Sequence, residues 1–315
     1  MANPTHTIFG PVPSRRLGFS LGIDLVPYKL CSLDCVYCQI DRTTEKSVTR
    51  KDYVCIDTIL EQLKARLAEG VKADVISLTG SGEPTLNAGL GDLIDGIRTL
   101  TSLPIAIITN STLLNEPQVR TQCAKADILL PSLDAVTPEA YAKVNRPHET
   151  LTVEALIQGL VDFRAQFSGE IWLEIFLVEG MNTDPEHLQA LKHAIERIAP
   201  NRVQLNTAVR PTADCGISRL SPERMLAIAN QLGPKCEIIA DFSKAPSTAE
   251  ETIGSDHILN LVDRHPSSMS DICACLGLSE AKARTLIAPL TGSGQVVCGQ
   301  KDGTTYYSTP KSTHR

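Results

Sequence analysis

Short apolar runs alternate with longer amphipathic segments along residues 20–240. The short runs are rich in Ile, Leu and Val, as in strands buried on both faces of a parallel sheet, and they cover residues 20–26, 74–78, 105–109, 127–132, 171–177 and 202–206. The longer segments have apolar residues at helical spacing and cover residues 56–69, 90–100, 118–125, 153–167, 185–198 and 222–232. This alternation predicts an α/β fold. Six strand–helix units are fewer than the eight of a closed barrel, so we expect a partial (β/α)6 TIM-like barrel, with residues 235–240 as a further edge strand.

The pattern changes after residue 242. Residues 243–255 are rich in Ser, Thr, Pro, Glu and Gly, and they predict a linker between a first domain, residues 1–242, and a second domain, residues 256–315. In the second domain the apolar spacing predicts helices over residues 258–262, 272–276 and 281–290, and strands over residues 295–300 and 304–309. The strands are joined by Lys301-Asp302-Gly303, and Asp-Gly is a strong hairpin signal. Three helices and a hairpin predict a small winged-helix domain.

The composition is typical of a globular protein. Of the 315 residues, 42% are apolar and 21% are charged, and no apolar run approaches the ~18 residues that cross a bilayer. We therefore expect no membrane contact. The formal net charge of −6 gives no general attraction to nucleic acid, although a local basic face would still allow binding. The chain has no leading apolar signal segment, so we expect a cytoplasmic protein whose cysteines stay reduced.

The most informative chemical signal is the cysteine triplet Cys31, Cys35 and Cys38, with C-x3-C-x2-C spacing. Three closely spaced thiolates can bind three irons of a [4Fe-4S] cluster, and with no fourth ligand nearby one iron stays open to a small molecule. Zinc is the weaker alternative, because no second C-x-x-C or H-x3-H pair follows to complete its tetrahedron. We expect most of the other cysteines to be packing residues. Cys215 is kept as a weak candidate because it follows a predicted strand.

Polar residues gather at the carboxyl ends of the predicted strands, which is where α/β sheets bind ligands. A glycine-rich turn after the second strand lets backbone groups approach a ligand closely, and its carboxylate can accept a hydrogen bond from an ammonium group. The residues at these strand ends are Gly80, Ser81, Gly82, Glu83, Asn110, Ser132, Asp134 and Asn206.

Arginines beside these strand ends are candidates for holding an anionic substrate, because the planar guanidinium binds phosphate or carboxylate through paired donors. Solvated or structural ion pairs are the alternative. The candidates are Arg15 and Arg16 before the cysteines, Arg146 in the polar loop 145–148, and Arg210 after the sixth strand.

With an aromatic residue, Tyr37, just before its last cysteine, the triplet resembles the signature of the radical S-adenosylmethionine (SAM) superfamily. The turn at residues 80–83 resembles that superfamily's Gly-Gly-Glu motif, with Ser81 in place of a glycine. The resemblance implies that SAM chelates the open iron. An electron from a donor such as flavodoxin or ferredoxin then cleaves SAM, and the resulting 5′-deoxyadenosyl radical removes hydrogen from a substrate. It also implies SAM contacts: adenine for Tyr37, the ammonium group for Glu83, ribose for Ser132 and Asp134, with Asn110 and Asn206 as further polar groups.

Residues 8–245 resemble one branch of the superfamily, which contains tRNA wyosine-synthase-like proteins. The substrate class is left open between an RNA base, a peptide and a small molecule. The winged helix suggests contact with a peptide, a protein or nucleic acid, although Lys282 and Arg284 give its third helix a poor phosphate footprint. The alternative function is an iron–sulfur redox-sensing regulator that binds DNA through the winged helix. Such a sensor has no need of a SAM pocket.

Overall fold

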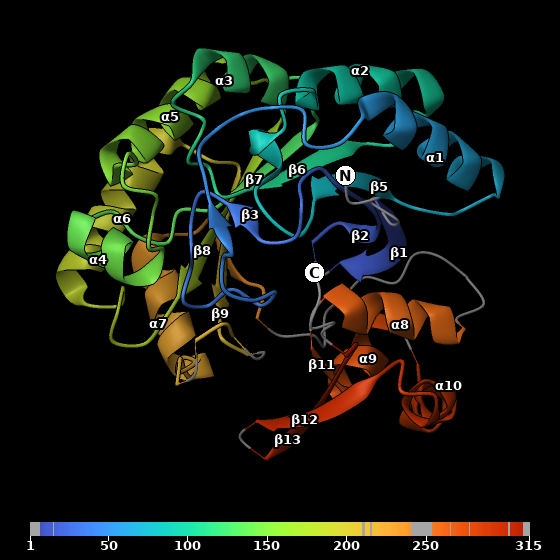
Figure 1. Ribbon diagram of the computed structural model, residues 1–315. Coiled ribbons are helices and arrows are strands. Elements are labelled where there is room, and N and C mark those ends of the chain that lie inside the picture. Colours follow the sequence, from blue (N-terminus) through green and yellow to red (C-terminus); the bar gives the residue numbers. More distant parts are fainter. Residues whose placement is uncertain are drawn as a thin grey trace.

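The computed structural model describes residues 7–14, 16–209, 212–214, 216–240, 254–264, 266–276, 278–301 and 303–310. Within these residues the largest sheet has eight strands in the order β1-β2-β5-β6-β7-β8-β9-β10. They are β1 (Ile8–Ser14), β2 (Gly18–Asp24), β5 (Val75–Thr79), β6 (Ile105–Thr109), β7 (Ile128–Pro131), β8 (Glu170–Leu177), β9 (Arg202–Thr207) and β10 (Cys236–Ile238). β1 is antiparallel to β2, and the later neighbours are parallel, so the sheet is mostly parallel (Figure 1).

The helices that connect these strands follow one another in an arc along the sheet (Figure 1). They are α1 (Ile56–Ala68), α2 (Leu90–Leu100), α3 (Pro117–Cys123), α4 (Pro138–Val144), α5 (Val153–Gln166), α6 (Pro185–Ile198) and α7 (Pro222–Leu232). The strands and helices predicted between residues 20 and 240 are all present, with ends shifted by at most two residues, and the expected edge strand is β10.

Besides three short elements, β3 (Leu30–Cys31), β4 (Glu45–Lys46) and the 3-10 helix Pro84–Leu86, the sequence did not predict β1 and α4. β1 contains a glycine and two prolines, which read as turn formers, but it lies at the edge of the sheet, where a missing N–H does not break a ladder. α4 has only seven residues, too few to show an apolar period. It begins with Pro138, and the side chain of Thr137 accepts a hydrogen bond from the Ala140 backbone N–H at 3.3 Å.

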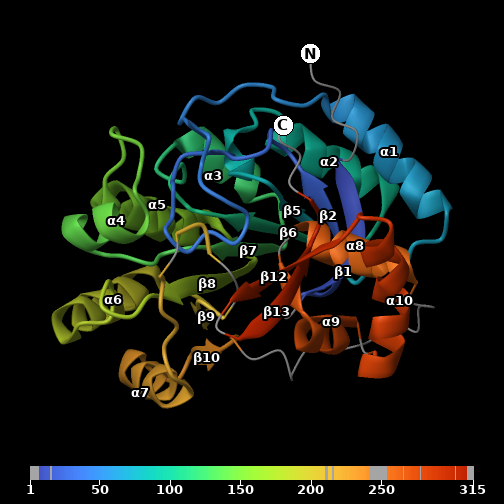
Figure 2. The same cartoon turned by 60° about the horizontal axis from the view of Figure 1, so that its bottom comes forward.

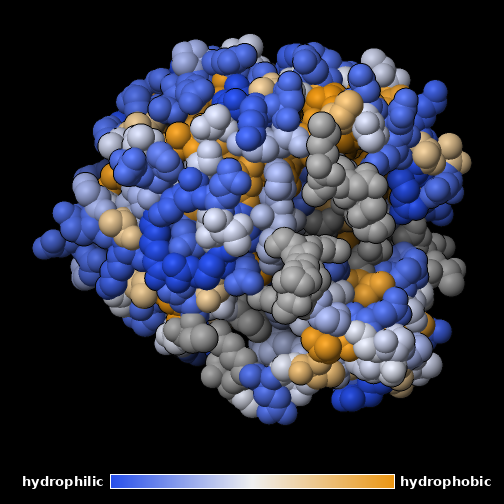
Figure 3. All heavy atoms as spheres, in the orientation of Figure 1, coloured by the Kyte–Doolittle hydropathy of each residue, from blue (hydrophilic) through white to orange (hydrophobic). Residues whose placement is uncertain are grey.

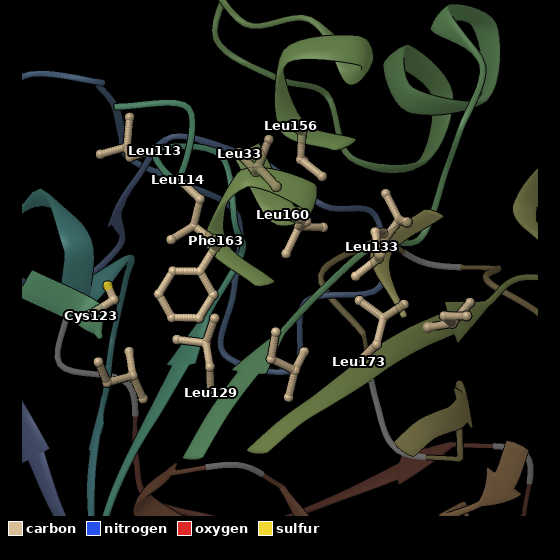
Figure 4. Packing of buried hydrophobic residues seen from close by; sticks show 14 of the residues in the cluster. Leu33, Leu113, Leu114, Cys123, Leu129, Leu133, Leu156, Leu160, Phe163 and Leu173 are labelled. Carbon is tan, nitrogen blue, oxygen red and sulfur yellow. The ribbon is translucent and has the colours of Figure 1, made fainter. Parts of the chain in front are cut away.

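The main core lies between the sheet and its helices. Leu156, Leu160 and Phe163 of α5 point toward Leu129 of β7 and Leu173 of β8 (Figure 4). All five side chains are almost fully buried, so each contributes about 1.5–3 kcal/mol of hydrophobic stabilisation. This packing fixes the ends of the strands relative to one another.

The other face of the sheet carries a smaller apolar cluster that includes Val75, Ala106, Leu130 and Trp172. Successive side chains of a strand point to opposite faces, so Trp172 and Leu173 face different layers. By the same alternation Glu174 and Phe176 share the face of Trp172. Polar residues at the carboxyl ends of the strands can therefore gather on this inner face.

The predicted helices and hairpin of the C-terminal region are present. The elements are α8 (Ser255–Arg264), β11 (Ser267–Ser268), α9 (Met269–Leu276), α10 (Glu280–Gly292), β12 (Val297–Lys301) and β13 (Thr304–Ser308). Strand β11, which the sequence did not predict, pairs with β13 and makes a three-stranded sheet in the order β11-β13-β12. The region has its own apolar core. Residues 243–253 of the predicted linker lie outside the described residues.

This C-terminal region contacts the large sheet at two places. α8 packs against β1 (Figure 2). On β13, Tyr306 Oη donates a hydrogen bond to the Val209 carbonyl, just after β9, at 3.2 Å. The region therefore reaches from the β1 edge of the sheet toward its β9–β10 side.

No described helix is both long enough and apolar enough to cross a membrane. Figure 3 shows a face that is mainly hydrophilic, with apolar side chains in small separate groups.

Because His187 is buried, we expect the free energy of unfolding of the protein to depend on pH. It lies in the first turn of α6 with only 3% of its surface exposed, and burial lowers the pKa of its imidazole. Below the unfolded-state pKa of about 6.5, the unfolded chain binds a proton that the folded chain does not, so stability falls as the pH falls. The loss is at most about 1.4 kcal/mol per pH unit. Urea unfolding of the cofactor-free protein between pH 7.5 and 5.5 should show a steeper loss for the wild type than for His187→Leu. Parallel pH profiles would contradict the assignment.

Candidate active site

The cysteine triplet lies in the loop that follows β2. Cys31 ends the short strand β3 (Leu30–Cys31), which pairs with β4 (Glu45–Lys46). Between the cysteines, Leu33 is buried in the main core (Figure 4) and Val36 is buried on the inner face, beside Phe176. These two anchors hold the backbone of the loop against the carboxyl ends of the strands.

The cysteines that the structure describes carry free thiols. Among the described side chains, no group of three or more His, Cys, Asp and Glu residues is arranged to hold a metal ion as it stands. A zinc site needs its ligands around one ion, whereas a cluster binds each thiolate to a different iron. Outside the triplet, Cys123 is buried as predicted, but Cys55 and Cys298 are exposed, so these two are not the packing residues that we expected. Cys215 lies outside the described residues.

Each sulfur of the triplet has a nitrogen donor, which comes from a distant segment for Cys31 and Cys35 and from the same loop for Cys38. Such N–H···S contacts are typical of iron–sulfur sites, where they tune the cluster. The pairs are Asn110 Nδ2 with Cys31 Sγ at 3.4 Å, Asn145 Nδ2 with Cys35 Sγ at 3.4 Å, and Lys29 Nζ with Cys38 Sγ at 3.1 Å.

Burial keeps the first two thiols neutral. It raises the pKa of Cys31 to about 12 and the pKa of Cys35 well above its usual value. Burial also disfavours the charge of Lys29, but the sulfurs of Cys38, Cys31 and Cys35 together outweigh this and raise the Lys29 pKa. A bound cation would have to displace protons from these cysteines, as metal ligation by thiolates requires.

The glycine turn at residues 80–83 packs directly against the cysteine loop. The Glu83 backbone N–H donates to the Leu30 carbonyl at 3.1 Å, and the Lys29 N–H donates to the Ser81 carbonyl at 2.8 Å. A Cβ atom on Gly82 would lie 1.9 Å from the Leu30 carbonyl oxygen. Only glycine therefore allows this close approach of the two backbones.

The side chain of Glu83 is buried and already bonded within the protein. Its Oε1 accepts from the Thr85 N–H at 3.0 Å and from the hydroxyls of Thr85 and Thr109 at 2.5 and 2.6 Å. Its Oε2 accepts from the Asn110 N–H at 2.7 Å. Burial raises its pKa, and these four donors oppose that rise. Glu83 thus joins the ends of β5 and β6, a structural role that the sequence did not reveal.

Asp134 is the centre of a second buried network. One carboxylate oxygen accepts from Tyr37 Oη and from Asn145 Nδ2 at 2.7 Å, and the other accepts from the Phe176 N–H at 2.8 Å. Burial raises the pKa of Asp134 to about 6. The ring of Tyr37 stacks on Phe176, with centroids 3.9 Å apart. Asp134 and Tyr37 therefore fix the cysteine loop to β8, whatever further contacts they make with a ligand.

Ser132 and Asn206 lie on the inner face beside this network. The hydroxyl of Ser132 has no hydrogen-bond partner in the described part of the chain, so it is ready to contact a ligand. Asn206 Nδ2 donates to Glu174 at 3.0 Å, and Arg16 forms an ion pair with Glu174 at 2.6 Å. Arg16, Glu174 and Asn206 form one polar cluster, the inner polar cluster.

The other candidate arginines divide into two groups. Arg146 is paired with Asp214, which also pairs with Arg42 at 3.0 Å. Asp214 donates its backbone N–H to the Val36 carbonyl at 3.1 Å, so this ion-pair network clamps the cysteine loop. Arg15 and Arg210 lie outside the described residues.

Several site residues were not identified from the sequence. Asp24, at the end of β2, accepts from the Ser81 N–H and hydroxyl at 2.9 and 2.6 Å. Lys29, Thr109 and Phe176 make the contacts described above. A usable signal existed for Asp24, because it is the one charged residue inside the otherwise mostly apolar predicted strand 20–26. The roles of Lys29 and Phe176 depend on contacts with distant segments, which no local pattern records.

Comparison with known proteins places this site in a family context. The profile of the Radical SAM superfamily matches residues 25–195, which include the cysteine loop and the glycine turn. A UPF0026 protein of Methanocaldococcus jannaschii is 31% identical over 306 residues, covering 95% of this chain and 94% of that protein.

Two further similar proteins differ in how much of their own length this chain covers. A Brachyspira hyodysenteriae protein named GTPase Obg is 35% identical over 93% of this chain, but this chain spans only 43% of its length. Among solved structures, a radical SAM methyltransferase from Sphaerobacter thermophilus superposes with a TM-score of 0.52 at 16% identity, over 72% of this chain and 68% of that one. That likeness concerns the fold.

Proposed function

The chain belongs to the radical SAM superfamily and to the UPF0026 proteins, so it is an enzyme that uses a [4Fe-4S] cluster and SAM. From this premise we propose which residues bind the two cofactors and where the substrate lies. The comparisons give no support to a redox-sensing regulator. When bound, the two cofactors supply a 5′-deoxyadenosyl radical through reductive cleavage of SAM.

The cluster ligands in this proposal are Cys31, Cys35 and Cys38. The observation that carries it is that all three sulfurs, held at the carboxyl ends of the strands, have N–H donors: Asn110 and Asn145 from other segments and Lys29 from the cysteine loop itself. Three thiolates with such donors fit a cluster that leaves one iron for SAM.

The SAM pocket in this proposal borders the cysteine loop. Gly80, Gly82 and Ser81 bring backbone groups close to the amino-acid part of SAM, and Glu83 and Asn110 hold that turn and the loop together. Ser132 offers its hydroxyl to the ribose. Asp134 and Tyr37 shape the adenine side through their shared network. In this arrangement Asn206 contacts the substrate and not SAM.

The inner polar cluster suggests where the substrate lies. Its carboxylate, guanidinium and amide are held within the inner face at the strand ends, next to Ser132. Such groups suit a substrate with several hydrogen-bonding edges, such as an RNA base, a peptide or a polar small molecule. The proposal leaves the substrate class open among these three. The electron would come from a flavodoxin or ferredoxin.

The domain division in this proposal is a partial (β/α)6 barrel, residues 1–242, and a winged-helix domain, residues 256–315. It is supported by helices along one face of the sheet (Figure 1) and by the element order α8-β11-α9-α10-β12-β13 with a separate core. The α8 contact with β1 and the Tyr306 hydrogen bond to the Val209 carbonyl support the further proposal that the second domain limits access to the inner face. It is proposed to recognise the peptide, protein or nucleic acid that carries the substrate.

The proposed function is tested by anaerobic reconstitution with iron and sulfide. The reconstituted protein, given SAM and either dithionite or reduced flavodoxin, should release 5′-deoxyadenosine and methionine in equal amounts. Omitting the reductant is the control. A protein that holds a full cluster but releases no 5′-deoxyadenosine with either reductant would contradict the proposed chemistry.

A further inference from the structure

Lys29 is a buried cation beside the cysteine triplet. Only 3% of its surface is exposed, and its ammonium lies 3.1 Å from Cys38 Sγ. Among the described residues, no carboxylate lies within ion-pair distance of this ammonium. A buried charge is costly unless an opposite charge accompanies it. The sulfur of Cys38 is therefore the group placed to supply that charge.

The backbone of Lys29 is held on both sides, so the position of the ammonium does not depend on a flexible loop. Its N–H donates to the Ser81 carbonyl at 2.8 Å, and its carbonyl accepts from Thr44 and Glu45 at 3.2 and 3.3 Å. Its φ of 58° lies in the left-handed region, which a non-glycine residue adopts only when its surroundings impose it.

We propose that Lys29 is the counter-ion of the iron–sulfur cluster. Its ammonium donates to the Cys38 thiolate, and its positive charge stabilises the cluster after it has gained one electron from the external donor. An added electron makes a thiolate-bound cluster more negative, so a buried cation raises the reduction potential. Lys29 acts through Cys38 and is a positioning residue. The inference deepens the proposed function and rests on the assignment of the three cysteines as cluster ligands.

The test measures the cluster itself, without SAM and without turnover. The wild type, Lys29→Met, Lys29→Gln and Lys29→Arg are reconstituted anaerobically, their iron is counted, and the reduced cluster is followed by electron paramagnetic resonance during a redox titration. Lys46→Gln is the matched control, because Lys46 is an exposed lysine of the same loop that donates to the carbonyls of Arg146 and Pro147.

In Lys29→Met and Lys29→Gln, which lack the charge, the ratio of reduced to oxidised cluster at the wild-type midpoint potential should be about tenfold lower. For one electron this corresponds to a shift of the midpoint potential of about −59 mV. Lys29→Arg and Lys46→Gln should titrate near the wild type. A fully loaded Lys29→Met protein with the wild-type potential would overturn the proposal.

The iron content of the Lys29 variants is a second test of the proposal. If Lys29→Met folds but holds no iron and Lys29→Arg restores it, the counter-ion is required for assembly and the proposal stands. If Lys29→Arg also fails, or the cofactor-free variants do not fold, Lys29 is structural and the proposal fails. If the wild type takes up no iron, the assignment of the three cysteines as cluster ligands is wrong. The iron count of the wild type therefore distinguishes a failure of that assignment from a failure of the Lys29 proposal alone.

Discussion

Cys38→Ala is expected to abolish SAM cleavage and to reduce bound iron from about four atoms per chain to a trace. A cluster held by three thiolates loses a ligand with no nearby replacement, because the sulfur of Cys38 is contacted by an ammonium and not by another metal-binding group. The cofactor-free protein should lose about 1–3 kcal/mol of stability, because the substitution leaves the buried Lys29 ammonium without its sulfur partner. Iron analysis, detection of 5′-deoxyadenosine and urea unfolding of the cofactor-free protein measure the three consequences.

Cys55→Ala is the matched control for this substitution. Cys55 is exposed at the start of α1, outside the cysteine loop, so its loss should leave the iron content and SAM cleavage unchanged. Retention of a full cluster in Cys38→Ala, with activity, would show that Cys38 is not a ligand.

Gly82→Ala is expected to destabilise the protein by more than about 3 kcal/mol and to impair cluster assembly. The new methyl group would lie 1.9 Å from the Leu30 carbonyl oxygen, and both partners are backbone, so no rotamer change relieves the clash. Relief requires β3 to move away from the glycine turn, and Cys31 moves with β3. Urea unfolding of the cofactor-free protein and iron content after reconstitution measure the two effects.

Gly292→Ala provides the comparison for Gly82→Ala. Gly292 ends α10, and a Cβ atom there would meet no atom within 4 Å. Its replacement should be neutral or slightly stabilising, because alanine favours the helix by up to about 1 kcal/mol. Equal stability of the two variants would mean that the contact between the glycine turn and β3 is looser than described.

The fold was largely predictable because its strands and helices carry strong local signals. Apolar runs such as residues 105–109 and amphipathic segments such as residues 185–198 correspond residue for residue to β6 and α6. The longest elements that were missed are β1, whose prolines are tolerated only at an edge, and α4, which is too short to show a period. For β1 the deciding fact is its position at the edge of the sheet, and for α4 it is the short length of the helix. The hydrophobic pattern of the sequence shows neither.

The sequence by itself determined the chemistry of this protein, because the spacing of Cys31, Cys35 and Cys38 is a local property of the chain. It also located the glycine turn and the polar strand ends. Only the tertiary structure decided what those residues do for one another. It bonds Glu83 to the end of β6, joins Asp134 to Tyr37, and places Lys29 against Cys38. The physical reason is that hydrogen bonds and buried charges depend on which distant segments meet in space, whereas metal-ligand spacing and strand periodicity are written in consecutive residues.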